Sequence, residues 1–139
     1  MNDCERLQEI LLIIGELASR AENGAIIIVE GLRDKASLEA LGVKGSIVMA
    51  SQQPLFNLSE RISRQTPDII ILTDWDDRGE ELAKNAEIFL KSNGARPDGE
   101  TRKKLRHLSK KEIMDIENLH GYVERLRLLC DTKQADVRR

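Results

Sequence analysis

The chain alternates between short aliphatic blocks and longer segments in which apolar residues recur every three or four positions. Uninterrupted blocks are typical of parallel strands covered on both faces, and they lie at residues 25–29, 46–50 and 68–73. The periodic segments predict amphipathic helices at residues 4–22, 34–41, 55–65 and 77–92. Strands that alternate with helices form β-α-β units, so we expect an α/β fold whose central sheet has about four mostly parallel strands, with helices on both faces.

The second half of the chain has a weaker pattern. Pro97 restricts the fourth predicted strand to an edge of the sheet. Ser109-Lys-Lys-Glu112 has the form of a capping box, which marks a helix start, and Gly121 should break or kink that helix. The expected elements are a strand at 95–98, helices at 101–108, 109–119 and 122–130, and a frayed polar end at 131–139.

Length and composition predict one domain that spans residues 1–139, with an aliphatic core. Cys4 and Cys130 lie near opposite ends of the chain and form no metal-binding pattern. We expect two reduced thiols in a cytoplasmic protein, although the sequence leaves a disulfide open. The apolar run at 10–14 is too short for a membrane span and has glutamates on both sides, so no membrane association is expected.

Charge is unevenly distributed along the chain. The net charge is −2, but residues 1–90 carry 9 basic against 16 acidic side chains, whereas residues 91–139 carry 13 against 8. The basic excess is densest between Arg96 and Lys111. This asymmetry is compatible with one surface that meets a polyanion while another holds a cation. An ordinary solvated helical face explains the basic segment equally well.

Carboxylates follow two of the aliphatic blocks directly. Glu30 ends the block at 25–29, and Asp74 and Asp76 follow the block at 68–73. Parallel strands finish on the same edge of a sheet, where open α/β folds bind their ligands, so these acids should converge if the two strands pair. Carboxylates arranged in this way hold divalent cations. Alternatively, each acid alone is a turn or capping residue, and Asp77 is expected to be the N-cap of helix 77–92.

Two motifs resemble those of the Toprim domain, which topoisomerases, bacterial primases, repair proteins and RNA-maturing ribonucleases share. They are Ile28-Val29-Glu30-Gly31-x-x-Asp34 and Ile69-Ile-Ile-Leu-Thr-Asp74-x-Asp76-x-x-Gly79. The residues of the second motif are most similar to those of small stand-alone Toprim proteins of archaea and some bacteria. These proteins are related to the nuclease that matures 5S ribosomal RNA. The resemblance implies a Toprim-like three-layer fold, with a motif core at 24–95 and a helical, basic extension at 96–139.

The resemblance also implies roles for individual residues. Glu30 matches the family's acid/base glutamate, which also ligates metal, and Asp74 and Asp76 match its metal-binding aspartates. Asp34 matches an additional catalytic acid, with an N-cap of the next helix as the alternative. The implied cofactor is Mg²⁺, with Mn²⁺ as the alternative ion. The chain departs from its small relatives at 50–55, where it lacks a glycine before the Pro-Leu pair.

The leading functional hypothesis is a Mg²⁺-dependent phosphodiester hydrolase that acts on structured RNA or DNA. The alternative is a non-catalytic module that binds metal and nucleic acid as a subunit of a larger assembly. The apolar face of helix 4–22 either covers the sheet or is buried in a homodimer. Trp75, between the two aspartates, is expected to pack in the core. Basic residues near the acids and in the basic segment are expected to meet the nucleic-acid backbone: Arg33, Lys35, Arg78, Arg102, Lys103, Lys104 and Arg106.

Overall fold

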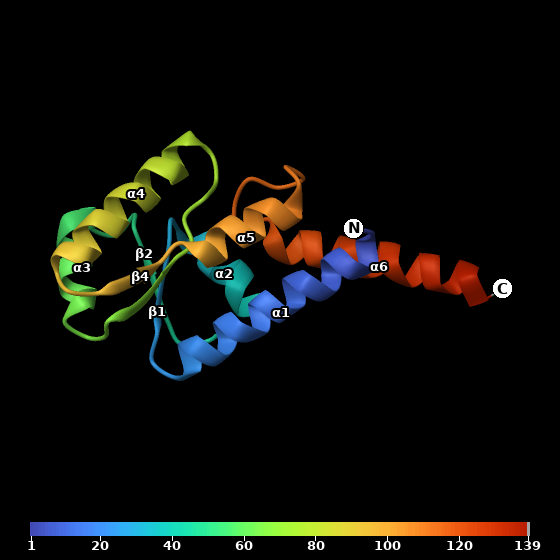
Figure 1. Cartoon of the computed structure of the whole chain (residues 1–139), viewed down its shortest axis with the longest axis horizontal. Coiled ribbons are helices and arrows are strands. Elements are labelled where there is room, and N and C mark those ends of the chain that lie inside the picture. The colour runs from blue at the N-terminus through green and yellow to red at the C-terminus, as the bar shows by residue number, and fades with distance from the viewer. Residues whose placement is uncertain (139) are drawn as a thin grey trace.

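The structure, a computed structural model, describes residues 1–138. In chain order its elements are α1 (Asp3–Glu22), β1 (Ile26–Val29), α2 (Leu32–Ala40), β2 (Ser46–Met49), α3 (Leu55–Ser63), β3 (Asp68–Ile71), α4 (Asp77–Ser92), β4 (Arg96–Asp98), α5 (Glu100–Ser109) and α6 (Leu119–Arg138). Figure 1 shows the strands in the middle of the body, with α1 and α6 extending from it toward the end that carries both termini.

The four strands form one parallel sheet in the order β2-β1-β3-β4. Ile26 of β1 is in register with Ser46 of β2 on one side and with Ile69 of β3 on the other. The chain therefore adds β2 on one side of β1 and then crosses to the other side for β3 and β4. The carboxyl ends of β1 and β3 flank this change of direction, which is where open α/β sheets form their ligand crevice.

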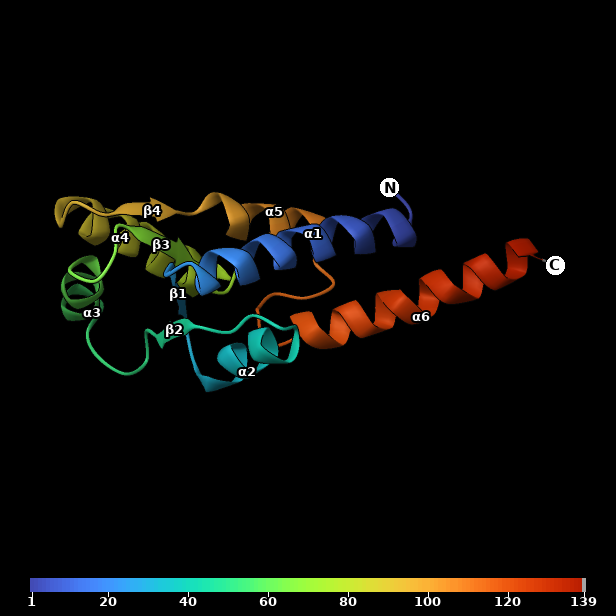
Figure 2. The same cartoon turned by 90° about the horizontal axis from the view of Figure 1, so that it is seen from below.

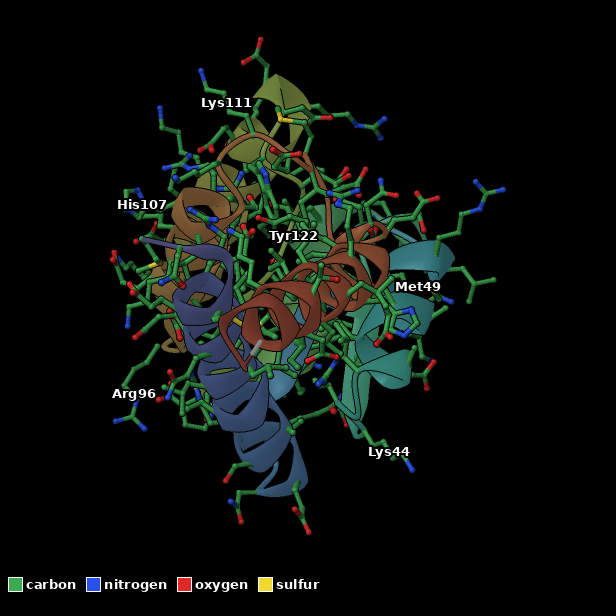
Figure 3. The ribbon with its side chains drawn as sticks, turned by 90° about the vertical axis from the view of Figure 1, so that its right-hand side faces the viewer. Lys44, Met49, Arg96, His107, Lys111 and Tyr122 are labelled. Atoms are coloured by element: carbon green, nitrogen blue, oxygen red, sulfur yellow. A yellow bond between two sulfur atoms is a disulfide. The ribbon has the colours of Figure 1, made fainter. Side chains whose placement is uncertain are left out.

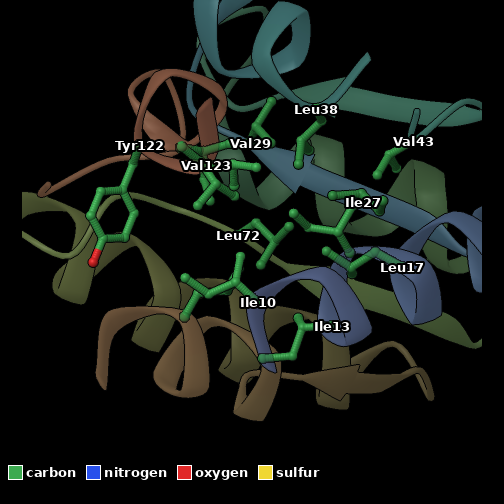
Figure 4. Packing of buried hydrophobic residues seen from close by; sticks show 14 of the residues in the cluster. Ile10, Ile13, Leu17, Ile27, Val29, Leu38, Val43, Leu72, Tyr122 and Val123 are labelled. Atoms are coloured by element: carbon green, nitrogen blue, oxygen red, sulfur yellow. The ribbon is translucent and has the colours of Figure 1, made fainter. Parts of the chain in front are cut away.

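Helices cover both faces of the sheet, as predicted. Ile27 and Val29 of β1 belong to a core cluster that includes residues of α1, α2, α5 and α6 (Figure 4). Ile26 and Ile28 belong to a second cluster with residues of α3 and α4. Successive side chains of β1 point to opposite faces and all four are buried, which explains why the strand is a continuous aliphatic run. Figure 2 shows the two helical layers from the side.

Helix α1 covers the sheet rather than leaving its apolar face exposed. Ile10, Ile14 and Leu17 recur at helical spacing and are at most 4% exposed. The C-terminal end of α1 is held by Arg20, whose guanidinium forms ion pairs with Asp68 at 2.5 Å and Asp98 at 2.6 Å. These pairs connect α1 to the beginning of β3 and the end of β4.

The second half of the chain differs from the sequence-based expectation. No helix begins at Ser109, because Lys110 and Lys111 take left-handed conformations with φ of 51° and 68°. Residues 110–118, named the strap here, instead run as an irregular segment from α5 to α6. Helix α6 then continues through Gly121, so the predicted break was wrong. The segment expected to be frayed is helical as far as Arg138, and residue 139 lies outside the described residues.

The two cysteines form a disulfide, which corrects the expectation of reduced thiols. Cys4 of α1 is bonded to Cys130 of α6 across a sequence separation of 126 residues. Helices α1 and α6 lie side by side, and this packing brings the two ends of the chain together (Figures 1 and 2). The spacing of the two cysteines in the sequence does not predict this contact. Among the described residues, no helix is both long enough and apolar enough to cross a membrane.

Candidate metal and nucleic-acid site

The acids at the ends of β1 and β3 converge. Because the two strands are paired, Glu30 lies beside the turn that carries Asp74, and its Oε2 accepts the backbone N–H of Asp74 at 2.7 Å. This hydrogen bond fixes one carboxylate against the backbone of the other acid. The structure therefore brings together two of the predicted site residues at the sheet's change of direction.

Asp74 occupies an unfavourable position for a negative charge. Burial, a side-chain hydrogen bond with Glu30, and the charges of Asp34, Glu30 and Asp115 raise the pKa of Asp74 to about 8. Its Oδ1 is buried and has no hydrogen-bond partner within the described residues. A buried oxygen that lacks a donor, among several carboxylates, is an arrangement that a divalent cation would stabilise.

Asp76 also serves as the N-cap of α4, which corrects the prediction of Asp77 for that position. Its Oδ1 accepts the backbone N–H of Gly79 at 2.7 Å. Asp76 is exposed, and Asp77 is the first residue of the helix. The cap uses only one carboxylate oxygen of Asp76, so Oδ2 is the oxygen that remains for another ligand.

Gly79 is required by the same turn. A Cβ at this position would lie 1.7 Å from the carbonyl oxygen of Asp74. The backbone of α4 thus packs directly against the backbone of the acid turn, and the Thr73 hydroxyl donates to the Gly79 carbonyl at 2.7 Å. This close approach, rather than phosphate contact, accounts for the glycine of the second motif.

Asp34 connects two segments through both of its oxygens. Its Oδ2 accepts the N–H of Gly31 at 3.0 Å, and its Oδ1 accepts the N–H of Glu117 in the strap at 2.8 Å. Burial raises the pKa of Asp34, and the two backbone N–H groups oppose this effect. Gly31, not Asp34, is the N-cap of α2. Both oxygens of Asp34 are thus engaged by backbone N–H groups, which connect the end of β1 to the strap.

Trp75 holds the strap against the acid turn. Its indole N–H donates to the carbonyl of Ile113 at 2.7 Å, and its backbone N–H donates to that of Met114 at 2.9 Å. The side chain is 5% exposed, so it packs in the core as expected. The strap in turn brings Asp115 close enough to Asp34 and Asp74 for its charge to act on both. Sequence reasoning missed Asp115, because it lies about forty residues after the second motif in a segment predicted to be helical.

Arg102 has a different environment from the one expected. It is 2% exposed, and it donates from Nε to the carbonyl of Thr73 at 2.9 Å and from Nη2 to that of Asp74 at 2.6 Å. Its Nη2 also lies 3.0 Å from Glu80. Arg102 therefore holds the backbone of the acid turn. Because it is buried, the prediction that it contacts phosphate was wrong. No pattern in the sequence distinguishes it from its exposed basic neighbours.

The other basic residues are nearer to solvent. Arg33 is 84% exposed at its side chain and lies 3.4 Å from Glu117. Arg106 pairs with Glu80. Lys103 and Lys104 border a groove of about 450 Å³ between α1 and α5, which also contains acidic residues. Figure 3 shows His107 and Lys111 on the periphery of the end from which α6 extends. Of the two remaining residues, Arg78 is exposed and Lys35 is half-buried.

The family model described as the Toprim domain matches residues 25–107, which include both acidic motifs. This chain belongs to the Toprim family. Membership implies a metal-binding function related to nucleic acids, and Toprim domains bind divalent metals, typically Mg²⁺.

Two relatives and one solved structure illustrate the family relationship. A UPF0292 protein of Methanosarcina barkeri is 48% identical over 124 residues, which cover 89% of this chain and 87% of that protein. A UPF0292 protein of Pyrococcus abyssi is 43% identical over 109 residues, covering 78% and 81%. A putative protein from Aquifex aeolicus has a TM-score of 0.66 at 27% identity and covers 77% of this chain and 94% of that one.

The Toprim acids offer only part of a metal's ligand shell. Within the part of the chain that the structure describes, no three acidic, histidine or cysteine side chains are grouped closely enough to hold a metal ion. Glu30 and the unpartnered oxygen of Asp74 nevertheless fit a divalent cation as a pair. Proteins commonly hold Mg²⁺ with one or two carboxylates, while water and substrate phosphate supply the other oxygens.

Proposed function

We propose that this protein is a Mg²⁺-dependent phosphodiester hydrolase that acts on structured RNA or DNA, with Mn²⁺ as the alternative ion. The observation that carries the proposal is the junction of β1 and β3, where Glu30 bonds to the backbone of Asp74 and leaves Asp74 Oδ1 buried without a donor. Toprim membership supports metal binding and a role with nucleic acids.

In this proposal Asp74 and Glu30 are the inner carboxylates of the site, and Asp76 reaches it with the oxygen that the cap leaves free. The cation, when bound, would neutralise the phosphate and lower the pKa of the attacking water. Glu30 would accept the proton of the attacking water, because its carboxylate lies beside Asp74 and is held there by the backbone N–H of Asp74. Asp34 and Arg102 keep the turn in place.

Positive charge for the nucleic-acid backbone comes from side chains that remain accessible. Arg33 and Arg78 lie within the two acidic motifs and Lys35 directly follows the first. Lys103, Lys104 and Arg106 belong to α5. Each phosphate that these residues neutralise would steepen the fall of affinity with salt. Arg106 and Arg33 also form ion pairs with carboxylates. To contribute to nucleic-acid binding, each would have to exchange its carboxylate partner for a phosphate.

The test is cleavage of labelled structured RNA and of supercoiled DNA, with Mg²⁺ or Mn²⁺. Glu30→Gln and the double variant Asp74→Asn/Asp76→Asn should each abolish cleavage while the circular dichroism spectrum is unchanged. Glu39→Gln is the matched control, since Glu39 is an exposed glutamate on α2. Cleavage that persists in the double variant excludes the proposed site.

A second candidate function is a non-catalytic metal- and nucleic-acid-binding subunit of a larger assembly. It is favoured by the absence of a three-ligand cluster among residues 1–138. Here Glu30→Gln should leave nucleic-acid binding unchanged, and the wild type should not cleave. Cleavage by the wild type separates the two candidates, because only the hydrolase turns over substrate and requires Glu30 for it. Calorimetric titration of Mg²⁺ into the double variant tests both candidates together, because both require Asp74 for metal binding.

A further inference from the structure

A second cavity is lined by the strap, the segment that packs against the acid turn. It has a volume of about 560 Å³ and lies between the strap and the first turns of α6. Met114 and Asp115 line it, and the carbonyl of Met114 accepts the N–H of Trp75, the residue that follows Asp74. The strap that lines the cavity is therefore bonded to the acid turn, and the size of the cavity falls in the range of ligand sites.

One wall of the cavity offers a flat cationic surface. The guanidinium of Arg125 lies over the ring of Tyr122, 5.2 Å from its centroid, and the Arg125 side chain is 53% exposed. The ring beneath is 4% exposed and fixed in the core (Figure 4). Arg125 Nη2 also lies 3.8 Å from Glu112 Oε2, and the exposed part of the guanidinium is a surface on which a planar ring can stack.

The remaining polar groups of the cavity favour a neutral ligand with hydrogen-bond donors. Glu112 and Asp115 contribute two negative charges against the single positive charge of Arg125. Asn118 adds an amide that is held by Asp115, whose Oδ1 accepts both its backbone and side-chain N–H groups at 2.9 Å. The net negative charge of the cavity repels an anionic phosphate. A nucleobase edge with amino and ring N–H donors is matched to the two carboxylates.

We propose that this cavity binds one unpaired nucleobase of the substrate strand, next to the phosphate at the acids, with a preference for guanine. The proposal rests on the proposed function in that it requires a nucleic-acid substrate. Single-stranded bases are recognised by stacking on arginine planes and by hydrogen bonds to their edges, and the cavity provides both. Guanine carries two adjacent donors, a ring N–H and an amino group, which can meet Glu112 and Asp115.

Gly121 provides a way to close the cavity without disturbing the fold. It lies in α6 on the cavity wall, and a Cβ built there meets no described atom within 4 Å. Gly121→Phe therefore places a ring in the proposed base position, and replaces the poorest helix former other than proline. Gly15→Phe is the matched control, because Gly15 is also an exposed helical glycine with the same open surroundings, on α1.

The experiment measures binding of fluorescent single-stranded 12-mers by anisotropy, with Ca²⁺ in place of Mg²⁺. Homologous RNA and DNA oligonucleotides, each with one guanine or with an abasic site in its place, distinguish the two kinds of strand. Gly121→Phe should bind the guanine 12-mer about tenfold more weakly than Gly15→Phe does. Replacing the guanine by an abasic site should weaken the binding of the 12-mer to Gly15→Phe by the same factor. It should leave the binding to Gly121→Phe unchanged. Thermal melting verifies that both variants are folded.

Equal affinity of the two variants for the guanine 12-mer overturns the base site and leaves the hydrolase proposal intact. An abasic loss that is the same in both variants also overturns it, because the lost base then lies elsewhere. Failure of the wild type to bind any 12-mer or structured nucleic acid overturns both proposals together.

Discussion

Replacing Asp74 with Asn should make the metal-free protein more stable at pH 8. In the folded protein burial, Glu30 and neighbouring negative charges raise the pKa of Asp74 from 3.8 to about 8. An unfolded chain ionises this group near its ordinary pKa. Between the two values the folded state holds more protons than the unfolded state, so the free energy of unfolding decreases as the pH rises through this window and levels off above it. Asn carries no charge and avoids this loss.

The size of the effect follows from the two pKa values. A difference of about 4 between the two pKa values corresponds to a loss of about 6 kcal/mol in the free energy of unfolding if no solvent screening occurs. Asp74 is partly exposed, and water screens its charge, so we expect about 1–2 kcal/mol of this to be observed. For a chain of 139 residues this raises the melting temperature by roughly 3–8 °C.

The assay is thermal denaturation in EDTA from pH 5 to pH 9, with Asp77→Asn as the control for loss of one negative charge in the same turn. The melting temperature of the wild type should fall relative to that of Asp74→Asn up to pH 8, whereas Asp77→Asn should follow the wild type. Addition of Mg²⁺ at pH 8 should stabilise the wild type and not Asp74→Asn, since a ligand stabilises only the state that binds it. Wild-type and Asp74→Asn curves that stay parallel over the whole range would refute the reasoning.

Three further predictions concern residues that stabilise the acid turn or the fold. Arg102→Met leaves the Asp74 carbonyl without its buried donor and should cost about 2–4 kcal/mol, measured by urea denaturation against an exposed control, Lys103→Met. Gly79→Ala should cost about 3 kcal/mol and abolish Mg²⁺ binding in calorimetry, because its methyl group collides with the same carbonyl. Cys130→Ser should lower the free energy of unfolding by roughly 2–4 kcal/mol in guanidinium. Dithiothreitol should lower the stability of the wild type to that of this variant; an unchanged wild type contradicts a structural role of the disulfide.

Sequence reasoning predicted the sheet and its two helical layers because β1, β2 and β3 lie in aliphatic runs and the helices up to α5 have an apolar stripe. Ile26–Val29 and Asp68–Ile71 required no tertiary information to be recognised as strands. Their pairing, which brings Glu30 to Asp74, was left open by the sequence and is established by the structure. The candidate acids themselves were recognised from the local pattern of aliphatic runs that end in carboxylates.

The errors occur where distant contacts override local preference. Ser109-Lys-Lys-Glu112 is a good helix start by itself, but Trp75 and Asp34 bind the backbone of the strap and hold it in an irregular path. The same contacts bring Asp115 to the acids. Arg102 resembles its basic neighbours in sequence, and only its place against the Thr73 carbonyl shows that it is buried. Arg102 bonds to carbonyls 28 and 29 positions earlier, and the strap that carries Asp115 is bonded to residues 38 or more positions earlier.

Trp75 is the only tryptophan of the chain, and this gives the molecule a natural optical probe. Its indole is buried beside the acid turn and bonded to the strap, so the emission of unlabelled protein comes from this one place. Release of the strap would expose the ring to water and shift its emission to longer wavelength while the helices stay folded. Titrations with cations or oligonucleotides can thus be followed at the site itself, in the native protein, with no dye attached.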